Sequence, residues 1–134
     1  LKTQWARLMA TVRPLQTALE AYYLANGIYP NDTLQGLDLD ITGCVEIGSG
    51  QLKCDGNLSM DYNGGARYAD RGFDMIEAHI RNSSGAHVVR ALIYLPHSKT
   101  NPGQTFCIGG SVLRNRLCKS LGGVATEGNN YLLP

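Results

Sequence analysis

The first 30 residues constrain the fold of this chain most, because they read as one long amphipathic helix. Apolar residues recur at alternating spacings of four and three, which places them on one stripe of a helix: Leu1, Trp5, Leu8, Val12, Leu15, Leu19 and Tyr22. Asn26-Gly27 favours the left-handed conformation that ends a helix, and Pro30 prevents it from restarting. The pattern predicts a helix over residues 1–26 whose apolar stripe packs against the rest of the domain.

The start of this helix carries no start signal. Leu1 already lies on the stripe, and no capping Ser, Thr or Asp precedes it. We therefore interpret Leu1 as a position inside a longer helix.

The second half of the chain shows the alternation that is typical of strands. Residues 73–81 and 86–95 each place apolar side chains on one face, and these are Ile76, Ala78, Ile80, Val89, Ala91, Ile93 and Leu95. Residues 105–108 are predicted to form a third strand. Leu113, Leu117 and Leu121 recur every four residues, which predicts a short helix that ends at Gly122-Gly123.

The order of these elements predicts one α+β domain over residues 1–134. The long helix (1–26) is followed by a Gly-, Asp- and Asn-rich connecting region (27–72), by antiparallel strands (73–109) and by a cysteine-bounded C-terminal region (107–134). We expect the helix stripe to lie on one face of the sheet.

Four cysteines in a chain of 134 residues favour disulfides and an oxidising compartment. The separations of ten (Cys44 to Cys54) and eleven (Cys107 to Cys118) contain no C-x-x-C, and no histidine lies close to either pair, so the spacing disfavours zinc. Three pairings are open. The sequential pairing closes the shortest loops.

The net charge of +1 hides an uneven distribution. Residues 1–19 carry +3, residues 20–77 carry −7 from ten acidic and three basic residues, and residues 78–134 carry +5 from six basic residues and one acidic residue. An acidic middle and a basic end suit head-to-tail contact between copies, although two ordinary solvated surfaces would give the same pattern.

No residue set indicates an enzyme, a cofactor or a metal, and we nominate no catalytic, cofactor-binding or metal-binding residue. His79, His87 and His97 lack triad or metal-binding spacing and are interpreted as surface histidines. Arg114, Arg116 and Lys119 lie on or beside the short second helix, where they can contact another subunit or DNA phosphates. Because no aromatic residues interleave with them, a solvated or subunit-contacting face is favoured over DNA.

Two segments resemble the type IV pilins and their pseudopilin relatives. The run Leu15-Gln16-Thr17-Ala18-Leu19-Glu20-Ala21-Tyr22-Tyr23, with its exit Asn26-Gly27-Ile28-Tyr29-Pro30, resembles the end of the long first helix of that family, and Pro14 fits the proline that such helices often carry. Cys107 and Cys118, followed by Lys119-Ser120-Leu121-Gly122-Gly123, resemble the disulfide-bounded C-terminal region of type IV pilins. The resemblance supports the bond between Cys107 and Cys118. With the short loops, it leads us to predict Cys44–Cys54 and Cys107–Cys118 as the disulfides.

The resemblance implies the pilin fold and a non-enzymatic structural subunit that polymerises into bacterial surface fibres for adhesion, twitching motility or DNA uptake. In that family an apolar N-terminal segment holds the subunit in the inner membrane before assembly and then packs in the fibre core. No residue of this chain corresponds to that segment, so we expect the chain as given to be monomeric or weakly associating. The implied partners are other pilin subunits, the pilus assembly machinery, the inner membrane, and a host surface or DNA.

Two alternative functions remain open. A pseudopilin of a type II secretion system shares the helix exit, although such subunits typically use calcium at the C-terminus, where this chain has a cysteine pair. A DNA-binding minor pilin is the second alternative.

Overall fold

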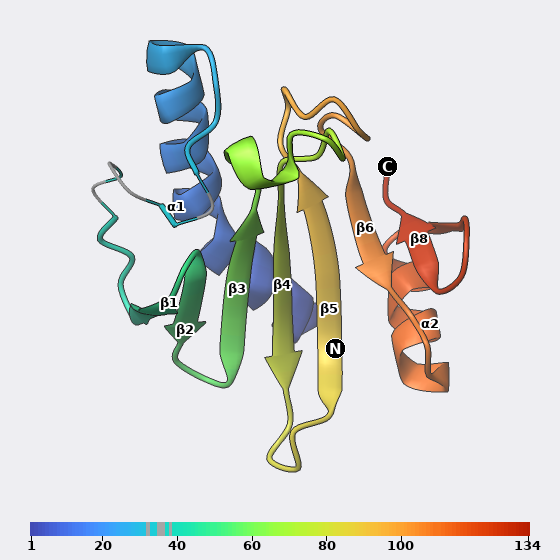
Figure 1. Cartoon of the computed structure of the whole chain (residues 1–134). Coiled ribbons are helices and arrows are strands. Elements are labelled where there is room, and N and C mark those ends of the chain that lie inside the picture. The colour runs from blue at the N-terminus through green and yellow to red at the C-terminus, as the bar shows by residue number, and fades with distance from the viewer. Residues whose placement is uncertain (32, 35–36, 38) are drawn as a thin grey trace.

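A long helix, α1 (Lys2–Asn26), lies across one face of an antiparallel sheet in the computed structural model, which describes residues 1–31, 33–34, 37 and 39–134 except the side chain of Arg67 (Figure 1). Within these residues the sheet has eight strands in the order β1-β2-β3-β4-β5-β6-β8-β7. The protein is therefore an α+β domain, as the sequence predicts. Asp32 and Asp38, which belong to the acidic middle segment, lie outside the described residues.

The strands and short helices have the following bounds: β1 (Cys44–Gly48), β2 (Gln51–Cys54), β3 (Leu58–Asn63), a 3-10 helix η1 (Gly65–Tyr68), β4 (Met75–Arg81), β5 (His87–Tyr94), β6 (Thr105–Ile108), α2 (Val112–Ser120), β7 (Val124–Ala125) and β8 (Asn130–Leu132). Each described strand pairs antiparallel with its neighbours.

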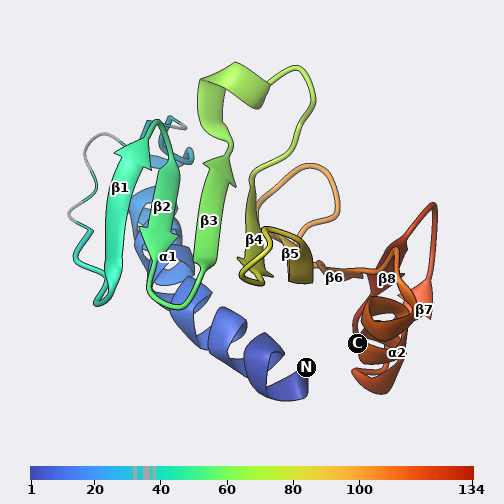
Figure 2. The same ribbon diagram turned by 90° about the horizontal axis from the view of Figure 1, so that it is seen from below.

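Helix α1 ends where the sequence predicts. Gly27 has a φ of 74°, a left-handed conformation, and its N–H donates to the carbonyl of Tyr23 at 2.7 Å. The helix bends between its two halves in both views (Figures 1 and 2). Pro14 lies inside it, and a proline there lacks the N–H of one intrahelical hydrogen bond, which explains a bend.

The apolar stripe of α1 forms the centre of the core. Five of its members are buried, namely Trp5, Leu8, Val12, Leu15 and Leu19. They share one cluster with the inward faces of β3, β4 and β5, and the predicted apolar residues of β4 and β5 all belong to it. The helix therefore covers the sheet through side chains that follow the helical period on one side and the strand period of two on the other.

The ends of the stripe differ from the prediction. Leu1 is exposed and Tyr22 is half-buried. The last turn of α1 extends past the sheet (Figure 1). Leu24 in that turn is 78% exposed, and Ile28 just after it is 64% exposed. The helical spacing continues to Tyr22, but the packing surface ends earlier.

Residues 27–72 were expected to form a connecting region, and this prediction was wrong for residues 44–63. Three strands, β1 to β3, extend the sheet there. Strand β3 does alternate, with Leu58, Met60 and Tyr62 buried, but short lengths and intervening Gly and Asn hide the pattern. Strand β1 gives no such signal, because its residues 45–48 are all exposed.

Smaller differences concern element ends and the C-terminus. Strand β4 begins at Met75 rather than residue 73, and β5 spans His87–Tyr94 rather than residues 86–95. Strands β7 and β8 have two and three residues, too few to show a period in the sequence.

Candidate functional site

The two predicted disulfides are confirmed, and they staple opposite ends of the sheet. Cys44–Cys54 joins the edge strand β1 to β2, and Cys107–Cys118 joins β6 to α2. Cys107 is 1% exposed and Cys118 is fully buried, so the second disulfide is part of the core. It fixes α2 on the face of the sheet that α1 also covers (Figure 2).

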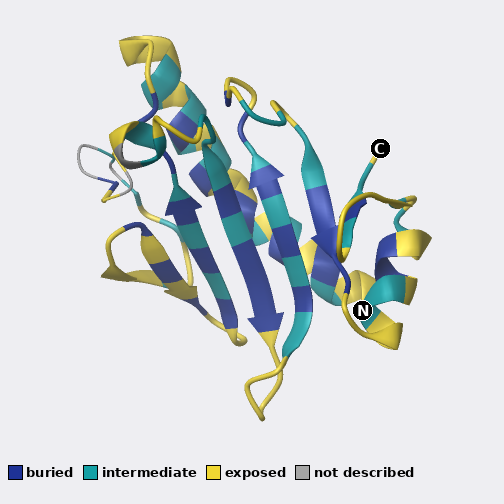
Figure 3. Ribbon diagram, turned by 45° about the vertical axis from the view of Figure 1, so that its right-hand side comes forward, coloured by how far each residue is buried: buried dark blue, intermediate teal, exposed yellow. Residues whose placement is uncertain are grey.

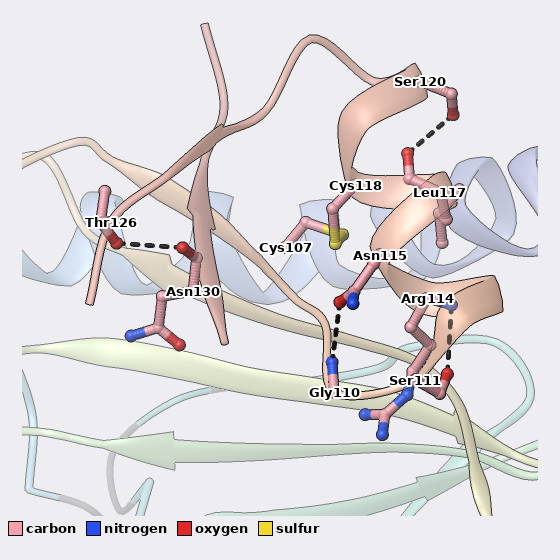
Figure 4. The surroundings of a disulfide bond; sticks show 10 residues. All are labelled: Cys107, Gly110, Ser111, Arg114, Asn115, Leu117, Cys118, Ser120, Thr126 and Asn130. Atoms are coloured by element: carbon pink, nitrogen blue, oxygen red, sulfur yellow. Dashed lines mark hydrogen bonds between the residues drawn. A yellow bond between two sulfur atoms is a disulfide. The ribbon is translucent and has the colours of Figure 1, made fainter. Parts of the chain in front are cut away.

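The start of α2 is held by two side-chain caps (Figure 4). The Ser111 hydroxyl accepts from the backbone N–H of Arg114 at 3.2 Å, and the Asn115 amide oxygen accepts from the N–H of Gly110 at 3.0 Å. A Cβ at Gly109 would lie 2.1 Å from that same Asn115 oxygen, so a glycine permits the close approach. These caps hold the start of α2, and the disulfide ties the helix to β6.

One face of α2 is exposed and mixes apolar with basic side chains. Val112 and Leu113 are 66% and 61% exposed, and Arg116 and Lys119 are exposed beside them at helical spacings of three and four. We call these four residues the α2 patch. Arg114 is half-buried and lies outside it.

The short helix that the spacing of Leu113, Leu117 and Leu121 predicts is present as α2, but these three residues do not share one buried face. Leu117 and Cys118 point into the core, as the disulfide requires, while Leu121 is half-buried. This orientation turns Leu113 toward solvent.

A second exposed apolar patch lies at the opposite end of the sheet. Val45 and Ile47 in β1 are 63% and 60% exposed and lie on the same face of the strand, with Glu46 between them on the other face. We call Val45 and Ile47 the β1 patch. The β1–β2 hairpin and α2 both carry exposed segments in Figure 3, at opposite sides of the buried central strands. Sequence reasoning missed this patch because its strand was not predicted.

The histidines do not all lie at the surface. His79 is 8% exposed, and its Nδ1 has no hydrogen-bond partner in the described part of the chain. Its ring meets that of His87 edge to face at 4.9 Å, and it lies opposite Arg90 in the register of β4 and β5. Strand β4 is central, so side chains on its outer face cover one another, and the surface prediction was wrong for His79.

His97 is exposed but engaged at the end of α1. Its Nδ1 lies 3.1 Å from Oε2 of Glu20, and its ring stacks on Tyr23 with centroids 4.1 Å apart. The Tyr29 hydroxyl donates to Glu20 and accepts from the backbone N–H of His97 at 3.0 Å. These contacts tie the helix exit to the loop after β5.

Among the residues that the structure describes, no group of three or more His, Cys, Asp or Glu side chains gathers as metal ligands would. Among the described helices, neither α1 nor any other has the length and apolar character needed to cross a membrane.

Comparison of the chain with protein-family models, with curated proteins and with solved structures gives no match.

Proposed function

We propose that this chain is a structural subunit of a type IV pilus, a fibre of many copies on the bacterial surface, and that it has no enzymatic role. The support begins with the resemblance of its helix exit and its late cysteine pair to that family. It continues with a long helix lying on an antiparallel sheet, and with a C-terminal helix tied to that sheet by a buried disulfide.

One observation carries the proposal furthest: the two ends of the sheet are unlike, and both expose large apolar side chains. The β1 patch lies on one edge strand, and the α2 patch lies beyond β6 near the other edge. A contact between unlike patches is heterologous, and such contacts generate open polymers when the rotation does not close into a ring. A subunit of a fibre needs this property.

The charges of the two ends favour the same arrangement. Residues 20–77, which include β1, carry −7, and residues 78–134, which include α2, carry +5. Exposed ion pairs contribute only about 0–1 kcal/mol each and weaken with salt, so they orient the contact more than they stabilise it. Stable fibres therefore need a further apolar surface, which in the pilin family is the N-terminal helix.

Photo-crosslinking in the bacterium of origin tests the proposal. The gene is altered to place a photoreactive amino acid at Ile47 or at Leu113, surface fibres are sheared from the cells, and crosslinked products are separated on a denaturing gel. We expect a ladder of multimers in the fibre fraction from both positions. The matched control is Ser84, an exposed residue in the turn after β4, away from both patches.

Two results would contradict the proposal. The protein could be absent from every sheared fibre and remain in the cell envelope. Alternatively, fibres could form in which Ser84 crosslinks with the same yield as Ile47 and Leu113. That result would show that the two patches make no preferred contact in the fibre.

A DNA-binding minor pilin is the second candidate, and the charge of α2 favours it. Its nine residues include Arg114, Arg116 and Lys119 and no acid. A titration of duplex DNA against the protein at several salt concentrations distinguishes the two. Three phosphate contacts give a slope of about −2.7 in a plot of log affinity against log salt, and the charge-neutral Arg116→Gln variant should reduce that slope by about 0.9. No measurable binding at low salt would leave α2 to subunit contact.

A further inference from the structure

A cleft of about 370 Å³ opens where three loops meet, and the proposed subunit role does not use it. Its lining comes from the end of α1 and the exit that follows, from η1 with the segment leading to β4, and from the loop after β5. The volume lies within the range of small-ligand sites in proteins, near the lower end.

One wall of the cleft is aromatic and belongs to the helix exit. The rings of Tyr23 and Tyr29 lie 4.7 Å apart, and His97 stacks on Tyr23 nearly in parallel, with an interplanar angle of 9°. Hydrogen bonds to Glu20 hold Tyr29 and His97 in place, so this wall is formed before any ligand arrives.

A second part of the lining is aromatic too. Tyr68 at the end of η1 and Phe73 in the segment before β4 have ring centroids 5.0 Å apart. The η1 backbone is pressed onto the helix exit, since a Cβ at Gly65 would lie 2.4 Å from the carbonyl oxygen of Pro30. The start of η1 therefore lies directly against the helix exit.

Asp74 and Lys99 supply charge of both signs to the lining. Oδ1 of Asp74 accepts from the backbone N–H of Gly65 at 2.8 Å. Burial raises the pKa of Asp74, while Lys99 acts in the opposite direction. A carboxylate has room for further donors beside the one from Gly65.

This combination selects the chemistry of the occupant. An anion in the cleft would be repelled by the Asp74 carboxylate, and a cation would be repelled by the Lys99 ammonium group. A wholly apolar molecule would strip water from the Asp74 carboxylate without replacing its hydrogen bonds. A neutral molecule with apolar C–H faces and several hydroxyl groups satisfies both the rings and the carboxylate. From this geometry we propose that the cleft binds a sugar ring, with its faces against the aromatic walls and its hydroxyls donating to Asp74 and accepting from Lys99.

The probes are the methyl glycosides of glucose, galactose and N-acetylglucosamine, added to the ¹⁵N-labelled chain. Amide shifts of Gly65, Gly72 and Lys99 report occupation of the cleft, because all three residues line it. We expect saturable shifts with at least one glycoside and an affinity in the millimolar range, as for other small ligands with few non-hydrogen atoms.

Two variants alter the cleft while sparing the fold. Phe73→Leu removes one ring and keeps an apolar side chain, and Asp74→Asn keeps an oxygen that can accept from Gly65 but removes the charge. Each should weaken binding about tenfold or more, because Phe73→Leu removes a stacking face and Asp74→Asn replaces charge-assisted hydrogen bonds with weaker neutral ones. The matched controls are Asp61→Asn, another part-buried carboxyl whose pKa is raised by burial, and Tyr94→Leu, whose ring packs on Phe106 away from the cleft.

Choline and inorganic phosphate serve as charged probes. The proposal is overturned if no glycoside shifts the cleft amides, if both cleft variants bind as the parent does, or if choline or phosphate shifts the same amides at lower concentration than any sugar. The experiment needs no fibre, so its outcome is independent of the proposed subunit role.

Discussion

Truncating the middle of the helix stripe should destabilise the domain severely. Leu15 is fully buried in the core cluster between α1 and the central strands. Replacing it with Ala removes three carbon groups, whose transfer from water accounts for roughly 2.4 kcal/mol at about 0.8 kcal/mol each. The cavity left in a packed core adds to this, so we expect Leu15→Ala to lower the free energy of unfolding by about 3–4 kcal/mol.

Urea unfolding monitored by circular dichroism measures the change. With a denaturant slope of about 2 kcal/mol per molar, the midpoint of the transition should fall by about 1.5–2 M. Both disulfides must remain oxidised in parent and variant, so that the unfolded states are comparable.

The chain offers a control with the same chemistry in the same helix. Leu24 is 78% exposed, and Leu24→Ala should change the free energy of unfolding by no more than about 0.5 kcal/mol. Equal midpoints for the Leu15 and Leu24 variants would refute the assignment of the stripe as the core face. A large loss from Leu24→Ala would show instead that the end of α1 is covered in solution.

Two further predictions concern acid and the disulfides. Burial lowers the pKa of His79, so the folded chain binds fewer protons than the unfolded chain. The free energy of unfolding should therefore fall as the pH drops from about 7.5 to about 5.5, with a limiting slope of about 1.4 kcal/mol per pH unit. In the His79→Gln variant the urea midpoint should vary less over this range, and an equal pH dependence would contradict the reasoning. Replacing both Cys107 and Cys118 by Ser should lower the free energy of unfolding by about 3 kcal/mol from the closed loop alone. The loss should exceed that from replacing both Cys44 and Cys54, because the two loops are similar in length but Cys44 is only half-buried. Equal losses in urea unfolding would mean that packing of the sulfurs contributes nothing.

The sequence by itself determined the elements whose signals are local and repeated. Helix α1 spans enough turns for its stripe to be unambiguous, and Gly27 fixes its end through the backbone alone. Strands β4 and β5 bury one full face each, so their alternation is visible before any partner is known. The cysteine pairs bond across short loops, so the sequential pairing could be favoured from chain distance.

Elements and sites that depend on neighbours far along the chain were decided by the tertiary structure. Strand β1 buries no residue of its own from 45 to 48 and exists because β2 offers it a hydrogen-bonding edge. His79 is buried because β3 and β5 flank its strand, not because of anything in its local pattern.

The cleft illustrates the same limit, since its walls are brought together from segments around residues 23–31, 65–74 and 97–99. Hydrophobic period is a property of a segment and can be read from its order of residues. Exposure of a face, and the meeting of side chains from distant loops, depend on what the rest of the chain places beside them, and only the folded arrangement sets that.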